Sequence, residues 1–203
     1  MNKIGKYLQE ISVIVIGIAI TLSVSYWISL KNEKRDMTLY LRAIKVEQEE
    51  NIKTVEKAIE YLKYSVSYSN YLRTNDKNSL NKDSLKSYFN VANNIQTYTF
   101  KTNAFEMFKN SGVMRLMDNK KLLLNIWGIY TELIELKQLL DEYNNRKWSL
   151  IENDIPLIEI NMGQAEFNII PMYSFYAVGA PIGMMAECEK VLENLYDFIS
   201  KLE

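Results

Sequence analysis

The side chains that could do chemistry in this chain are few and mostly acidic. Its 203 residues include no His and a single Cys, Cys188, which excludes His-based catalysis, Cys/His zinc sites and an intrachain disulfide. Four carboxylates gather around residues 155–165, where paired acids could catalyse hydrolysis or bind Mg²⁺ or Ca²⁺: Glu152, Asp154, Glu159 and Glu166. Their spacing lacks the alternating acids of a calcium loop, so solvated charge is the simpler interpretation. We expect no catalytic residue, metal or cofactor, and a protein that is not an enzyme.

Two further motifs could bind ligands. Residues 110–112, with the sequence Asn-Ser-Gly, could direct backbone amides at an anion, although Asp118 nearby argues against one and a helix stop followed by a turn is the preferred interpretation. Four tyrosines at spacings of three and four could form a stacking surface or cover the junction between core and solvent: Tyr61, Tyr64, Tyr68 and Tyr71. No basic stripe accompanies them and the net charge is −1, so we expect no nucleic-acid partner.

An uncharged stretch at residues 11–30, called here the anchor segment, begins the helical part of the chain that would position any such site. As a helix its 20 residues would extend about 30 Å, the thickness of a bilayer's hydrocarbon core. Eleven of them are Ile, Val or Leu, and Tyr26 and Trp27 near its end are typical interfacial anchors. We predict a single transmembrane helix, preceded by a flank at residues 1–10.

A cleaved signal peptide is the main alternative to a retained anchor. Lys3 and Lys6 would form its basic region and residues 13–22 its apolar core, with small residues at 23–25 for cleavage. The apolar run continues past that point to Leu30, which favours an anchor. Basic residues flank both ends, so the charge pattern leaves the orientation of the following domain open.

Residues 31–203 predict one helical domain. No Gly or Pro occurs from Ile18 to Ser111, which favours long helices. Helices are predicted over about 31–72, 84–96, 103–110, 119–154 and 186–202; Asp83 and Asp118 are the expected N-caps, Gly112 the left-handed stop, and Pro156 the end of the fourth helix. A second uncharged window, residues 167–186, contains Pro and Gly breakers, so we expect a buried or interfacial connection rather than a second span. The first of these helices carries an apolar stripe at helical spacing: Leu41, Ile44, Gln48, Ile52, Val55, Ile59, Leu62 and Val66.

Two further patterns predict helix association. Small residues at Gly17, Thr21 and Ser25 share one face of the anchor segment and could bring two membrane helices together, although such residues also occur in spans without that role. The helix-packing seam, with steps of four and three, predicts either a coiled coil between copies or, by preference, the core of an intrachain bundle: Leu122, Ile126, Ile129, Leu133, Leu136 and Leu140, continued by Tyr143 and Leu150.

Residues 6–27 (KYLQEISVIVIGIAITLSVSYW) and 40–51 (YLRAIKVEQEEN), with NSGVMRLM at 110–117, NKKL at 119–122 and Ile129-Tyr130, resemble an uncharacterised Bacteroidetes family of N-terminally membrane-anchored helical proteins, a domain-of-unknown-function family. One departure is Ser25, followed by Tyr26, where the family usually has Asn before Trp. The resemblance implies a single anchor and a helical domain and supplies no activity.

The sequence therefore predicts an all-α protein, with one transmembrane helix that continues into a long-helix antiparallel bundle or coiled-coil-like domain. The leading hypothesis is a non-enzymatic, single-pass protein of the bacterial inner membrane, acting through self-assembly or by scaffolding a partner at the lipid bilayer. The alternative is a sensor or effector whose bundle binds a small ligand and transmits a helix shift to the membrane.

Overall fold

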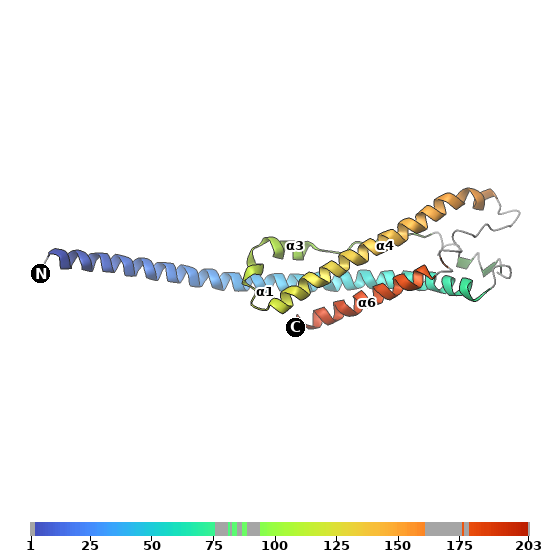
Figure 1. The fold of residues 1–203 in the computed structure, drawn as a ribbon. Helices are drawn as coiled ribbons and strands as arrows, with labels where there is room; N and C mark the ends of the chain where they lie inside the picture. The colour runs from blue at the N-terminus through green and yellow to red at the C-terminus, as the bar shows by residue number, and fades with distance from the viewer. Residues whose placement is uncertain are drawn as a thin grey trace. The chain divides into compact units, whose positions relative to one another are not determined.

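The computed structural model describes residues 3–75, 81, 83–84, 87–88, 94–160, 176 and 179–202, without the side chains of residues 3–6, 8, 9 and 150–160. Within this part every regular element is helical and none is a strand, which confirms the all-α prediction. The elements are α1 (Lys3–Thr74), α3 (Asn103–Asn110), the 3₁₀ helix η2 (Val113–Leu116), α4 (Lys120–Ile160) and α6 (Ala180–Ser200) (Figure 1). They divide into two compact units, one of residues 1–44 and 103–119 and the other of residues 45–102 and 120–203.

The first unit contains the N-terminal part of α1, together with α3 and η2. Phe108 is fully buried, and its ring lies 5.9 Å from that of Tyr40, centroid to centroid. Helix α3 has the predicted bounds, and Gly112 after it has a φ of +74°. An L side chain rarely adopts this backbone conformation and glycine adopts it freely, so the predicted left-handed stop is confirmed.

The second unit contains the C-terminal part of α1, the segment 94–102, α4 and α6. The stripe on α1 is confirmed, because each of its predicted positions is buried or half-buried. From Ile126 to Tyr143 the seam on α4 is also buried within the chain, and Leu122 is half-buried; the side chain of Leu150 lies outside the described residues. Helix α6 contributes a third apolar face: Met184, Cys188, Val191, Leu195 and Phe198. In the described residues these three apolar faces are thus buried within one chain.

Hydrogen bonds give the direction of these helices. On α4, Tyr130 and Lys147 reach Glu47 and Tyr61 of α1 in ascending order, so α1 and α4 run parallel in this unit. Helix α6 runs the other way, since Tyr196 near its end donates to Glu56 of α1 over 2.8 Å, whereas Ser69 donates to the carbonyl of residue 176 before it. The expectation of an antiparallel arrangement is therefore wrong for α1 and α4. The extended segment 94–102 explains this, because it returns along α1 before α4 begins.

Several predicted boundaries differ from the structure. Helix α4 begins at Lys120, one residue later than predicted, and continues to Ile160, so Pro156 does not end it; a proline removes one hydrogen bond to the preceding turn and weakens a helix without always stopping it. Helix α6 begins six residues before the predicted start. Pro181 lies in its first turn, where a missing N–H costs nothing, and Gly179 precedes it with a φ of +83°. These residues start a helix rather than break one.

The predicted second helix is the least successful assignment. Residues 94–96 are not helical, and its other positions are helical at 83–84 and 87–88 or lie outside the described residues. Asp83 is not the cap: the Oδ1 atom of Asn81 accepts hydrogen bonds from the backbone N–H groups of Asp83 (2.8 Å) and Ser84 (3.3 Å). An Asn side chain can cap a helix as well as Asp. Most of the second apolar window, residues 167–175, 177 and 178, also lies outside the described residues.

Candidate functional site

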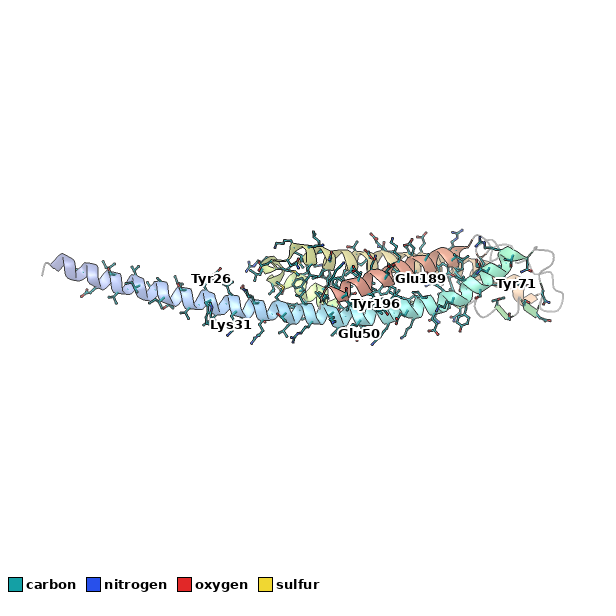
Figure 2. The ribbon with its side chains drawn as sticks, turned by 90° about the horizontal axis from the view of Figure 1, so that it is seen from below. Tyr26, Lys31, Glu50, Tyr71, Glu189 and Tyr196 are labelled. Carbon is teal, nitrogen blue, oxygen red and sulfur yellow. The ribbon has the colours of Figure 1, made fainter. Side chains whose placement is uncertain are left out.

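The anchor segment is the first candidate, because its apolar side chains have no protein neighbours that bury them. From Ile11 to Ile28 the bulky apolar side chains are 48 to 67% exposed, including Tyr26 and Trp27 (Figure 2). By length and composition, one helix in the described part could cross a membrane, and its most apolar window is entirely exposed. A core helix of a soluble protein would bury such a window. The Nζ atom of Lys31 lies 5.7 Å from the Trp27 ring, an ammonium over an aromatic face at the end of the apolar run.

The three small residues of the anchor segment lie on an open face. An added Cβ at Gly17 would meet nothing within 4 Å. The Thr21 hydroxyl donates to the Gly17 carbonyl over 2.9 Å, a bond within the same helix. Gly17 therefore leaves room for another helix, whereas the Thr21 hydroxyl already has an acceptor and does not depend on a second chain.

The second candidate is a groove in the second unit, with a volume of about 770 Å³. One wall comes from α1 and the other, called here the outer wall, from the segment 94–102. All ten lining residues are polar or tyrosine: Thr54, Lys57, Glu60, Tyr61, Tyr64, Asn94, Gln96, Thr97, Tyr98 and Thr99. Two of the four tyrosines singled out from the sequence, Tyr61 and Tyr64, line this groove. The other two, Tyr68 and Tyr71, instead stack on Tyr88, with centroid distances of 4.9 and 5.7 Å. The predicted tyrosine surface is thus divided between two places.

A buried lysine lies behind the groove. Lys147 on α4 has no exposed surface, and its Nζ atom donates to the Tyr61 hydroxyl over 2.7 Å and to the Asn94 carbonyl. Burial lowers the pKa of Lys147 to about 7, because an apolar environment disfavours the charged amine. The amine can therefore gain or lose a proton near neutral pH. It does not line the groove itself and acts on it through Tyr61 and Asn94.

Two further buried phenols, Tyr143 and Tyr176, interact with Tyr61, the tyrosine that bonds this lysine. Burial raises the pKa of Tyr61 to about 12 and raises the pKa values of Tyr143 and Tyr176 further, so all three stay neutral at physiological pH. The Tyr98 hydroxyl is buried and has no hydrogen-bond partner in the described part of the chain. Burial also raises the pKa of Cys188 to about 12, so its thiol is not a reactive nucleophile. These phenols and the thiol stay protonated, so the cluster packs the interior and contributes no nucleophile.

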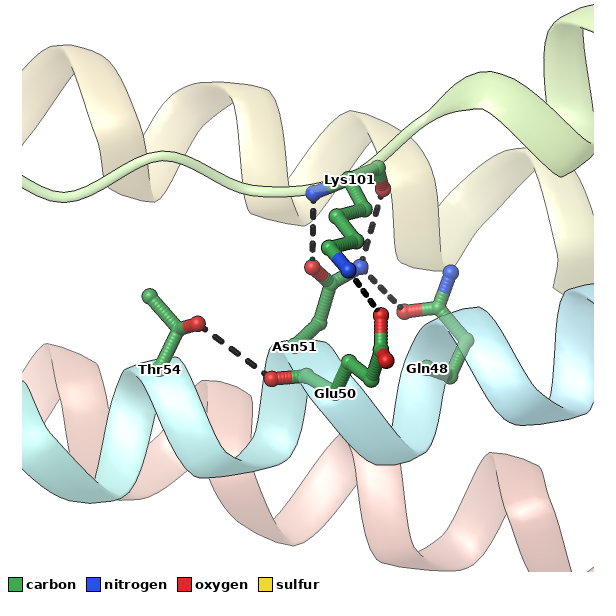
Figure 3. A network of polar contacts seen from close by, with 5 residues as sticks. All are labelled: Gln48, Glu50, Asn51, Thr54 and Lys101. Carbon is green, nitrogen blue, oxygen red and sulfur yellow. Dashed lines mark hydrogen bonds and ion pairs between the residues drawn. The ribbon is translucent and has the colours of Figure 1, made fainter.

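The outer wall of the groove is fixed by polar contacts with both long helices. The Asn51 side chain clamps the backbone of residue 101: its Oδ1 accepts from the Lys101 N–H over 2.7 Å and its Nδ2 donates to the Lys101 carbonyl over 3.0 Å (Figure 3). Nδ2 also donates to Gln48, and the Lys101 ammonium pairs with Glu50. On α4, Asn144 donates to the Gln96 carbonyl over 2.7 Å. An extended segment without a partner strand thereby has its backbone groups satisfied at several points.

The sequence contains a signal for Lys147 in the periodicity of the seam. The seam reaches Tyr143 and then steps by seven residues to Leu150, and the skipped position is Lys147. A long cation where the period requires a core side chain indicates a buried polar contact. No comparable pattern indicates the extended outer wall of the groove, and residues 94–96 are instead predicted as helix.

The other predicted motifs do not form a site in the described residues. At 110–112 the Ser111 hydroxyl donates to the Phe108 carbonyl and accepts from the Val113 N–H, as in a helix stop followed by a turn. Glu166 lies outside the described residues, and the side chains of Glu152, Asp154 and Glu159 are likewise not described. Elsewhere in the described chain no group of three acidic, Cys or His residues could hold a metal ion. No protein-family model, curated protein or solved structure matches the chain.

Proposed function

We propose that this chain is a single-pass membrane protein whose helical domain acts without catalysis, by holding copies of itself or a partner at the bilayer. The observation that supports this most is the exposure of the anchor segment, which combines bulky apolar side chains with the absence of any charge over 20 residues. Its eleven Ile, Val and Leu residues favour insertion by roughly 3–7 kcal/mol in total. Apolar side chains have a lower free energy in lipid hydrocarbon than in water, so such a surface favours the membrane.

The remainder of the proposal is a three-helix bundle built from α1, α4 and α6. Its support is the shared burial of the three apolar faces and the hydrogen bonds that join each pair, of which Asn194 to Glu132, over 2.7 Å, joins α6 to α4. Bundles of this kind bury their stripes internally. Because the seam on α4 is buried by the same chain, we propose that copies associate through the open face at Gly17. The bacterial inner membrane and the Bacteroidetes family resemblance belong to this proposal and rest on the sequence.

Fractionation of cells that express the full-length chain tests the proposal. We expect the protein in the membrane pellet after an alkaline wash, released by detergent and with an intact N-terminus by mass measurement. A mature chain that starts near residue 25 would instead identify a signal peptide. Recovery of the uncut chain in the soluble fraction would contradict membrane anchoring outright. Mass measurement of the detergent-free protein in nanodiscs then gives the copy number: several copies support self-assembly, and one copy leaves partner scaffolding.

A second candidate function is supported by the groove and the lysine behind it. In this function the helical domain binds a small ligand that displaces Tyr61. Because Tyr61 on α1 bonds Lys147 on α4, the displacement is transmitted from one helix to the other. A ligand shifts two helices between two arrangements only if it contacts the two arrangements differently. Residues of this groove are bonded to α4, so a movement of α4 would change the contacts that the ligand makes. A thermal-shift screen of metabolites on the full chain tests this function, and uniform absence of stabilisation would exclude it.

A further inference from the structure

Two of the three tyrosines of the groove, Tyr61 and Tyr98, present ring faces rather than hydroxyl groups. The Tyr61 hydroxyl is already bonded to Lys147 and to the Asn94 carbonyl, and the Tyr98 hydroxyl is buried although its residue lines the groove. Tyr64 is 61% exposed. The surface that Tyr61 and Tyr98 offer to the groove is therefore mostly aromatic, and Tyr64 adds an exposed ring. Such rings suit a ligand with flat or C–H faces.

Between the rings, the polar side chains of the groove are mostly uncharged. The hydroxyls of Thr97 and Thr99 and the amides of Asn94 and Gln96 can each donate and accept hydrogen bonds. The Thr54 hydroxyl already donates to the Glu50 carbonyl over 3.2 Å, so it can accept a bond from a ligand. The two charged residues, Lys57 and Glu60, are of opposite sign, so the lining has no net charge. This argues against a nucleotide or another polyanion, which needs an excess of cations, and the density of polar groups argues against a hydrocarbon chain.

The wall of the groove formed by segment 94–102 is held in place by contacts within the protein. This outer wall is attached at Asn94, Gln96 and Lys101 by bonds from both long helices, described above. A preformed wall loses little conformational freedom when it binds, which improves affinity. Lys147 is thus a positioning residue, because it holds the Tyr61 ring and the start of the wall without lining the groove.

We propose that this groove binds a neutral saccharide, with Tyr61, Tyr64 and Tyr98 stacking on sugar-ring faces while the threonine and amide groups bond the sugar hydroxyls. A sugar ring combines an apolar C–H face with hydroxyls around its edge, which matches the combination of aromatic faces and uncharged polar groups. This inference rests on the second candidate function, ligand binding by the helical domain, and names its ligand class.

The test titrates the full chain in phosphatidylcholine nanodiscs, since maltoside and glucoside detergents would themselves compete for the groove. The probes are neutral linear trisaccharides of glucose, galactose, mannose and N-acetylglucosamine, measured by calorimetry and by saturation-transfer NMR. We expect at least one to bind at millimolar concentration or tighter. Tyr64→Ala should weaken binding about tenfold through loss of stacking, and Thr97→Val about fivefold through loss of one hydrogen bond. Both side chains are exposed, so the fold should survive.

Tyr196→Ala is the matched control. Tyr196 is 51% exposed on α6 and is not part of the groove, so binding should be unchanged. Absence of binding by every trisaccharide, or equal loss in Tyr64→Ala and Tyr196→Ala, would overturn the saccharide proposal. If the trisaccharides fail while a metabolite or peptide in the thermal-shift screen stabilises the chain in a Tyr64-dependent way, ligand binding stands and the ligand class is wrong. If nothing binds, both fail.

Discussion

Two stretches of the same helix meet different surroundings. Residues 11–30 of α1 contain no charge and expose their apolar side chains, whereas residues 45–74 place apolar side chains on one stripe and bury it. Both stretches have the same helical backbone, so helical geometry does not distinguish them. The distribution of charge around the helix does, because a charged face requires water and an all-apolar circumference requires lipid or protein on every side.

The two stretches also obtain their stability differently. In residues 45–74, burial of side chains such as Val55 and Leu62 stabilises the helix against α4 and α6. In residues 11–30 no side chain is buried by the protein. In the proposed membrane span, lipid would stabilise this helix instead, because backbone hydrogen bonds have no competing water there. Substitutions of the same kind in the two stretches should therefore have opposite consequences.

The largest contrast is expected when arginine is placed on exposed apolar positions in each stretch. Ile18→Arg with Leu22→Arg should oppose membrane insertion by about 5–7 kcal/mol, because each arginine lies near the middle of the span. Val46→Arg with Tyr64→Arg, also at exposed positions, should leave the membrane fraction unchanged. Quantitative fractionation of cells measures both. Equal membrane fractions for the two double variants would remove the basis of the comparison.

The reverse contrast is expected for loss of apolar volume. Leu62→Ala, at a position with 1% exposure, should lower the free energy of unfolding of the helical domain by about 2–5 kcal/mol, since it leaves a cavity. Leu22→Ala removes the same atoms from a 65% exposed position and should leave the domain's unfolding unchanged. Thermal unfolding followed by the fluorescence of Trp127 and Trp148 separates the two. A similar loss in both would mean that residues 11–30 pack on protein.

The sequence was sufficient for the parts of the fold that depend on periodicity. The stripe on α1 and the seam on α4 follow from one side chain in every three or four being apolar, and α3 follows from its breakers. The parallel course of α1 and α4 did not follow, because it depends on an extended return at residues 94–102 that is held by Asn51 and Asn144. Such contacts join residues about 50 positions apart, and local propensity contains no information about them. The interruption of the seam at Lys147 indicates a buried polar contact, but its partners could not be predicted, since they come from two other segments.

Lys147, which bonds Tyr61 in the buried stretch of α1, gives the helical domain a pH-dependent stability. Its folded pKa of about 7 lies below the ordinary 10.5, so between these values the unfolded chain binds more protons and stability rises with pH. The rise should be about 2 kcal/mol between pH 7 and pH 9. Above pH 10 the buried tyrosines, whose folded pKa values are raised, should reverse it. Lys147→Met should flatten the rise in a series of urea unfolding curves, and an unchanged slope would contradict the assignment.

The smallest effect is expected within the anchor segment, where the open face at Gly17 distinguishes packing from hydrogen bonding as the force that brings copies together. Gly17→Leu fills the space in which a second helix would approach, and should weaken association by about 1–2 kcal/mol. Thr21→Val keeps the shape and removes only a hydroxyl that already bonds the Gly17 carbonyl, so its effect should be below about 0.6 kcal/mol. Energy transfer between labelled copies in vesicles measures both. A larger loss in Thr21→Val would mean that the hydroxyl exchanges its own helix for a neighbour, and hydrogen bonding rather than close backbone approach would then drive assembly.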